Sequence, residues 1–154
     1  MTIRPFRKDD TGQLLELLRL NTPLYFAPSE EADLAEYLDK YAESYFVVEE
    51  GGKVIGAGGI NYFLASGEAR ISWDILHPAY QGKGIGKQLL HYRIVLIKTN
   101  PAIRLVIVRT SQLVYKFYEK AGFRLEKVQK DFWAKGYDLY QLHLPLAVQQ
   151  PAAI

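Results

Sequence analysis

The sequence contains no cysteine among its 154 residues. Disulfide scaffolds, thiolate zinc sites, iron–sulfur clusters and cysteine nucleophiles are therefore excluded. It also lacks an apolar run of about 18 residues, which a membrane-spanning helix needs, and its first residues lack the apolar stretch of a signal peptide. Hydrophobic residues make up 49% and charged residues 23%, which are values of a globular protein. We therefore expect a soluble, cytoplasmic protein with no membrane partner.

Signals of several other functions are also missing. The basic residues form no continuous run, which argues against a nucleic-acid partner. His77, His91 and His143 lie too far apart in sequence to show metal-ligand spacing, so we expect no metal. The G-x-S-x-G elbow of serine hydrolases does not occur.

The charge is unevenly distributed although the net charge is only +2. Residues 1–80 carry a net charge of −6, and residues 81–135 carry a net charge of +9. A basic half suggests a polyanionic ligand, and an acidic half can attract a cationic one. The alternative is that solvated helix faces of opposite charge simply fall in different halves.

Apolar periodicity predicts alternating groups of strands and helices. The strands are expected at residues 2–7, 45–48, 53–64, 69–76, 103–108, 123–128 and 137–144, and the helices at about 10–21, 29–41, 84–97 and 111–121. Residues 45–76 are expected to form an antiparallel meander. No repeat or linker interrupts the pattern, so we expect one α+β domain over residues 1–146 and a loose tail over residues 147–154.

The most informative segment is the glycine-rich turn at residues 81–87, between an expected strand and an expected helix. Its three glycines at alternate positions let the backbone approach a ligand closely and point N–H groups inward. The N-terminus of the following helix and two flanking lysines add positive charge. This combination favours a phosphate site, whereas the Rossmann and P-loop patterns fit the spacing less well. The alternative is a turn that merely begins a helix.

Two motifs in this part of the chain resemble those of the GNAT acyltransferases. Residues 81–86 (QGKGIG) resemble the family's Q/R-x-x-G-x-G/A motif, and residues 111–123 (SQLVYKFYEKAGF) resemble its N-x-x-A-x-x-F-Y-E-K-x-G-F block. The resemblance implies a mixed, mostly antiparallel central sheet of about seven strands flanked by about four helices. It also implies that acetyl-coenzyme A is the cosubstrate and that the enzyme is an N-acetyltransferase.

The same resemblance implies a set of cofactor-binding positions: a strand end that pairs with the pantetheine arm, the glycine-rich turn around the pyrophosphate, and part of the second motif. These are Ile75, Leu76, Gln81, Gly82, Lys83, Gly84, Ile85, Gly86, Lys87, Ser111 and Tyr115. Ser111 departs from the family's usual Asn, so a side-chain contact to the cofactor is altered or lost there. Val114 stands where the family usually has Ala.

Tyr118 matches the position at which many family members place the acid that protonates the departing thiolate. A phenol is protonated at neutral pH, so it can donate a proton, although a core tyrosine is the alternative. The family's strand glutamate, a base in some members, aligns with Arg70. Glu68 and Asp74 are the nearby carboxylates, and even spacing predicts both on one face with Arg70. We rank Asp74 first as base, with a salt bridge to Arg70, a water chain or an already deprotonated substrate as alternatives.

The segment between the first two helices, residues 22–30, is apolar and aromatic, and the resemblance implies that it shapes the acceptor site. Tyr25 and Phe26 are therefore the candidate substrate-binding residues, with a hydrophobic plug over the core as the alternative. The acidic half favours a cationic amine of a small molecule or peptide. Further aromatic residues, Trp73, Phe132, Trp133 and Tyr137, are expected along the cleft or at a homodimer contact.

The function expected from these features is transfer of an acetyl group from acetyl-coenzyme A to a primary amine, directly, in a ternary complex. The absence of cysteine removes the commonest covalent route but does not establish direct transfer. A non-catalytic module that senses coenzyme A or binds a partner protein is the alternative.

Overall fold

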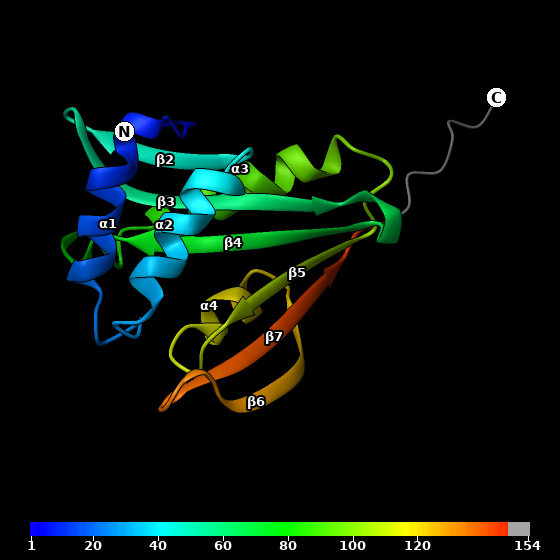
Figure 1. Cartoon of the computed structure of the whole chain (residues 1–154). Coiled ribbons are helices and arrows are strands. Elements are labelled where there is room, and N and C mark those ends of the chain that lie inside the picture. The colour runs from blue at the N-terminus through cyan, green and yellow to red at the C-terminus, as the bar shows by residue number, and fades with distance from the viewer. Residues whose placement is uncertain (148–154) are drawn as a thin grey trace.

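The computed structural model describes residues 1–147 (Figure 1). The strands are β1 (Thr2–Pro5), β2 (Tyr45–Glu50), β3 (Lys53–Phe63), β4 (Glu68–Leu76), β5 (Leu105–Thr110), β6 (Arg124–Ala134) and β7 (Tyr137–Pro145). The helices are α1 (Thr11–Leu20), α2 (Glu30–Lys40), α3 (Ile85–Lys98) and α4 (Tyr115–Lys120). Within residues 1–147, no helix is long and apolar enough to cross a membrane. The expected tail lies outside the described residues from position 148 onward.

All seven strands join one sheet in the order β1-β2-β3-β4-β5-β7-β6. Every neighbouring pair is antiparallel except β4 and β5, which run parallel. The prediction of a mixed, mostly antiparallel sheet of seven strands with four helices is therefore confirmed.

The parallel pair β4 and β5 separates along its length. Pairing extends from Glu68 to Ile71 on β4, opposite Leu105 to Val108 on β5, and then stops. Figure 1 shows the two strands splaying apart beyond that point. Splayed strands leave their facing backbone N–H and C=O groups without a ladder, so the sheet opens at its centre.

Two apolar cores lie on opposite faces of the sheet. The α1–α2 core contains Leu14, Leu18, Leu34, Leu38, Val47 and Ile75, among others. The α3–α4 core contains Ile55, Ile71, Leu89, Ile97, Val108, Tyr118 and Leu142, among others. The apolar residues that recur at helical spacing in α1, α2 and α3 are the ones buried here, which explains why periodicity predicted these helices.

The last helix is shorter than predicted. A helix was expected from Ser111, but residues 111–114 form a turn in which the N–H groups of Val114 and Tyr115 donate to the Ser111 carbonyl. The helix then runs only from Tyr115 to Lys120. Ser111 caps the turn, because its Oγ accepts the N–H of Leu113 at 3.2 Å.

A bulge near the end of β4 reverses which face its side chains occupy. The register with β3 shifts between Ser72 and Ile75, and Trp73 has a positive φ of 49°. Ile71 packs in the α3–α4 core, whereas Ile75 packs in the α1–α2 core. Four residues apart in a regular strand, these two side chains would share a face. The bulge therefore re-aims every side chain that follows it.

Candidate active site

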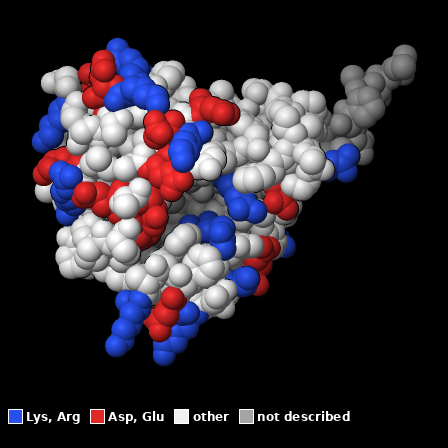
Figure 2. All heavy atoms as spheres, viewed as in Figure 1, with Lys and Arg blue, Asp and Glu red and all other residues white. Residues whose placement is uncertain are grey.

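A cleft of about 740 Å³ occupies the opening between β4 and β5. Its walls come from β4, from β5, from the first turn of α3, from α4 and from the segment between α1 and α2. Figure 2 shows a hollow in one face of the molecule, with acidic side chains gathered to one side and basic side chains at its edge. The cleft therefore reaches residues that are distant in sequence and belong to both faces of the sheet.

The glycine-rich turn forms one end of the cleft. Gly82 and Gly84 have φ values of +76° and +80°, a left-handed conformation that side chains rarely adopt. The first hydrogen bond of α3 runs from the Gln88 N–H to the Gly84 carbonyl at 3.0 Å. The N–H groups of residues 85–87 therefore have no intrahelical acceptor. Free N–H groups at a helix N-terminus, beside open space at Gly82 and Gly84, fit an anion such as a phosphate.

Most of the expected cofactor residues line the cleft, and two do not. The lining residues are Ile75, Leu76, Gln81, Gly82, Gly84, Ile85, Gly86, Lys87 and Ser111. Lys83 lies outside, with its ammonium 5.2 Å from the centre of the Tyr80 ring. Tyr115 is also outside, and its ring packs 4.5 Å from that of Tyr140.

The end of β4 presents a free edge to the cleft. Beyond Ile71, β4 has no partner strand on its β5 side within residues 1–147. On its other side β4 pairs with β3. The carbonyl of its last residue, Leu76, accepts a hydrogen bond from the buried Asn21 side chain at 3.0 Å. Asn21 also donates to the Leu17 carbonyl at 2.9 Å, so it holds the strand end against α1. An extended ligand with amide groups can add to such an edge as a strand would.

A charged network lies at the centre of the cleft. Asp74 Oδ1 accepts from Arg93 Nη1 at 2.6 Å, and its Oδ2 accepts the hydroxyl proton of Tyr118. The Arg93 side chain is 1% exposed and also donates to the Gly59 carbonyl at 3.1 Å. A Cβ at Gly58 would collide with the Asp74 carboxylate, so only glycine leaves room for this ion pair.

The position of Asp74 corrects the prediction from even spacing. Asp74 does not share a face with Arg70, because the bulge turns Asp74 toward α3 while Arg70 faces the opposite side. Its ion pair is with Arg93, not with Arg70.

Burial raises the pKa of Tyr118 well above its ordinary value, and the adjacent Asp74 carboxylate raises it further. The nearby Arg93 guanidinium opposes this effect in part. Tyr118 is therefore protonated throughout the neutral range, and its proton is held against Asp74.

The model of the acetyltransferase (GNAT) family matches residues 13–123, which include both the glycine-rich turn and Tyr118. The chain belongs to this family. It is an N-acetyltransferase. Among residues 1–147, no group of three or more His, Cys, Asp or Glu side chains is arranged to hold a metal ion.

Individual relatives agree with this assignment. An N-alpha-acetyltransferase of Sulfurisphaera tokodaii is 26% identical over 94% of this chain and 92% of its own. The ribosomal-protein-S18-alanine N-acetyltransferase of Escherichia coli has a TM-score of 0.79 at 17% identity, over 99% of this chain and 98% of its own. An aminoglycoside 6'-N-acetyltransferase solved with coenzyme A has a TM-score of 0.76 at 16% identity, over 98% of this chain and 100% of its own. These two structures share the fold with this acetyltransferase.

The other end of the acetyltransferase cleft is aromatic. Tyr25 and Phe26 both line it. The Phe26 ring stacks on the Trp73 ring, with their centres 6.1 Å apart. Trp133 and Tyr137 line the opposite wall, and the Tyr137 hydroxyl donates to the Pro23 carbonyl across the opening. This bond joins β7 to the segment before α2.

Several cleft residues of the acetyltransferase were not among the sequence candidates. The sequence pattern could have identified Arg93, because this charged residue interrupts the apolar positions Leu89 and Ile97 on one face of α3. No sequence pattern identifies Glu30 or Arg109, since their neighbours in the cleft come from distant parts of the chain. Burial raises the pKa of Glu30, whose carboxylate accepts the Ala27 N–H at 2.7 Å.

Proposed function

We propose that this acetyltransferase moves the acetyl group directly from acetyl-coenzyme A to a primary amine of a small molecule or peptide while both are bound. The observation that carries this proposal is the single cleft between β4 and β5. It reaches the glycine-rich turn on the α3–α4 face of the sheet. It also reaches an aromatic wall on the other face, formed by Phe26 and Trp73. Two substrates entering from opposite faces would meet at Asp74, with no cysteine in the chain to carry the acetyl group.

The backbone supports the proposed cofactor positions. The N–H groups of residues 82–87 would hold the pyrophosphate, with Lys87 adding charge. The free edge of β4 at Ile75 and Leu76 would pair with the amides of the pantetheine arm. Ser111 lies beside this path, buried at the start of its turn. Lys83 and Tyr115 lie outside the cleft, so they would contact the cofactor only if their side chains moved into it.

In the proposed mechanism, the Asp74–Tyr118 pair passes a proton from the amine to the leaving thiolate. As the amine nitrogen attacks the thioester carbon, Asp74 accepts a proton from that nitrogen. The C–S bond breaks, and Tyr118 gives its phenolic proton to the leaving thiolate. The proton on Asp74 then returns to the Tyr118 oxygen along their hydrogen bond. Arg93 stabilises both the Asp74 carboxylate and the transient phenolate.

The peptide and small-molecule classes each have support among the relatives. The Sulfurisphaera relative is named an N-alpha-acetyltransferase and the Escherichia coli structure an alanine N-acetyltransferase, which favours a peptide α-amine. The aminoglycoside enzyme shows the same fold in a protein that is named for a small amine substrate.

Replacing Tyr118 by Phe tests the proton path. We expect kcat to fall by roughly a hundredfold or more, since positioned acid catalysis contributes about 10²–10⁴. Calorimetric affinity for acetyl-coenzyme A should stay within about twofold, because the phenol bonds to Asp74 and not to the turn. Tyr92→Phe is the matched control, and it should leave both quantities unchanged because that ring packs against Phe46, outside the cleft.

Equal losses of turnover and affinity in Tyr118→Phe would contradict its role as the acid. Direct transfer itself predicts intersecting initial-velocity lines when both substrates are varied. Parallel lines, or an acetylated protein detected by mass spectrometry, would contradict it. Wild-type protein that binds acetyl-coenzyme A but acetylates no amine in a broad panel would support the non-catalytic alternative.

A further inference from the structure

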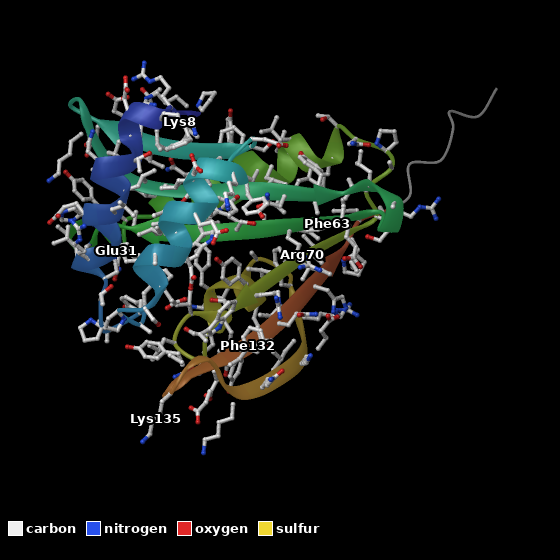
Figure 3. All side chains as sticks on the ribbon, in the orientation of Figure 1. Lys8, Glu31, Phe63, Arg70, Phe132 and Lys135 are labelled. Atoms are coloured by element: carbon white, nitrogen blue, oxygen red, sulfur yellow. The ribbon has the colours of Figure 1, made fainter. Side chains whose placement is uncertain are left out.

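Two arginines lie in the cleft on the face opposite the glycine-rich turn. Arg70 of β4 and Arg109 of β5 both line the cleft. Their strand neighbours Ile71 and Val108 pack in the α3–α4 core, so the two arginines point to the other face. Figure 3 shows Arg70 beside Phe63, with Phe132 on the β6 side of the opening.

Each guanidinium rests on an aromatic ring. The Cζ atom of Arg70 lies 4.5 Å from the centre of the Phe63 ring. The Cζ atom of Arg109 lies 4.9 Å from the centre of Phe132 and 5.9 Å from that of Trp133. Stacking holds a guanidinium in place while its in-plane N–H groups stay free to donate. The arrangement is therefore preorganised to receive an anion from the cleft.

No carboxylate of residues 1–147 forms an ion pair with either arginine. By contrast, Arg4, Arg19 and Arg93 each pair with an acidic side chain. The Nε atoms of Arg70 and Arg109 are buried without a hydrogen-bond partner in the described chain. Burial, followed by repulsion from Arg70, lowers the pKa of Arg109. Two partly buried like charges are costly unless an anion joins them.

The phosphates of the cofactor are poorly placed to be that anion. The free N–H groups that would hold them belong to the first turn of α3, and Ile85 of that turn packs in the α3–α4 core. The two arginines face away from that core. The aromatic wall, where the acceptor is expected, lies on their side of the sheet with Phe26 and Trp73.

We propose that Arg70 and Arg109 form an anion subsite for the acceptor, so that the preferred substrate is an amine that carries a carboxylate or another negative group close to the amine. This inference rests on the proposed acetyl transfer to an amine. It names a property of the acceptor that the family assignment leaves open.

An acceptor that carries an anion differs from the cationic acceptor that the charge distribution of the sequence favoured. The acidic half does not line the cleft with negative charge. Asp33, Glu36, Asp39 and Glu43 are exposed on α2 and just beyond it, and only Glu30 and Asp74 reach the cleft. Asp74 is neutralised by Arg93.

The test measures kcat/KM for pairs of acceptors that differ only in one negative charge. One pair is alanine and alaninamide, which removes the α-carboxylate. The other pair is two C-terminally amidated tetrapeptides with Asp or Asn at the second position. We expect the wild type to favour the charged member of at least one pair, and that pair identifies whether the anion is an α-carboxylate or an acidic side chain.

Arg70→Gln and Arg109→Gln should each lower kcat/KM for the favoured charged acceptor by roughly 10- to 100-fold, as loss of a charged hydrogen bond does. Turnover of its neutral partner should change less than about twofold. Arg70→Lys should recover part of the loss because it restores the charge without the planar fork. Arg104→Gln, at an exposed position, is the matched control and should change neither rate. Comparing variants for each acceptor removes the effect of different amine pKa values within a pair.

The same acceptors titrated calorimetrically into enzyme saturated with coenzyme A give a readout that needs no turnover. Weaker binding of the charged acceptor in both Gln variants would support the subsite. A ratio of charged-acceptor to neutral-acceptor kcat/KM that is the same in the wild type and in both Gln variants would overturn it. A wild-type protein that neither binds coenzyme A nor acetylates any acceptor would instead contradict the proposed function.

Discussion

The two ends of the cleft are built in different ways. At the end proposed for the cofactor, backbone N–H groups of one continuous segment, residues 82–87, would form the anion site. At the end proposed for the acceptor, single side chains from β4, β5, β6 and the segment before α2 are brought together. A site made of consecutive backbone groups is encoded by a local pattern of glycines. A site made of distant side chains has no local pattern, so residues such as Arg109 carry no sequence signal.

The largest expected effect is a loss of cofactor affinity when the glycine-rich turn alone is changed. Gly84→Asp places a carboxylate, in a strained left-handed conformation, where the pyrophosphate is proposed to bind. We expect affinity for acetyl-coenzyme A, measured by calorimetry, to fall by roughly 10³-fold, since opposed like charges cost several kcal/mol. Gly51→Asp is the matched control, because Gly51 also has a positive φ and open space but lies in the β2–β3 hairpin. Unchanged affinity in Gly84→Asp would remove the cofactor from this turn.

The next largest effect is on stability, and it tests the Arg93–Asp74 ion pair that lies between the two ends of the cleft. Arg93 belongs to α3, which begins at the glycine-rich turn, and it holds the Asp74 carboxylate at the cleft centre. Arg93→Met should lower the free energy of unfolding in urea by about 3 kcal/mol, because it leaves a partly buried carboxylate without its cation. Adding Asp74→Asn should recover part of that loss. Arg104→Met should change stability by less than about 0.5 kcal/mol. Additive effects of Arg93→Met and Asp74→Asn would show that the pair is not coupled.

The smallest expected effect is on the pH dependence of stability, and it concerns Glu30, which lines the cleft. Burial raises the pKa of Glu30, so folding favours its protonated form, and its contribution to stability declines as the pH rises through that raised pKa. Glu30→Gln should therefore raise the Tm at pH 7 by about 2 °C, and the gain should vanish below the ordinary glutamate pKa of about 4.3.

Glu31→Gln is the control with the opposite sign. Arg19 lowers the pKa of Glu31, so replacing that carboxylate should lower the Tm at pH 7. Thermal unfolding between pH 3.5 and 7 measures both variants. A Tm gain in Glu30→Gln that is the same at every pH would show that the effect does not arise from ionisation.

Much of the fold was predictable from the sequence because its elements have strong periodic patterns. The apolar stripes of α1, α2 and α3 and the β-branched run of β5 predicted buried elements within a few residues of their observed bounds. The helix from Ser111 was predicted too long, since the chain first makes a capped turn there. The face of Asp74 was predicted wrongly, because alternation fails at the bulge around Trp73, which no local residue pattern announced.

The sequence by itself determined the family, the order of strands and helices along the chain, and the glycine-rich turn, because each depends on residues close together along the chain. The tertiary structure alone decided which charges meet in the cleft. The splay of β4 from β5 opens the site, the bulge turns Asp74 toward Arg93 and Tyr118, and the opposite face gathers Arg70 and Arg109. These contacts join residues that are tens of positions apart, so they depend on sheet geometry, which no sequence pattern in this chain specified.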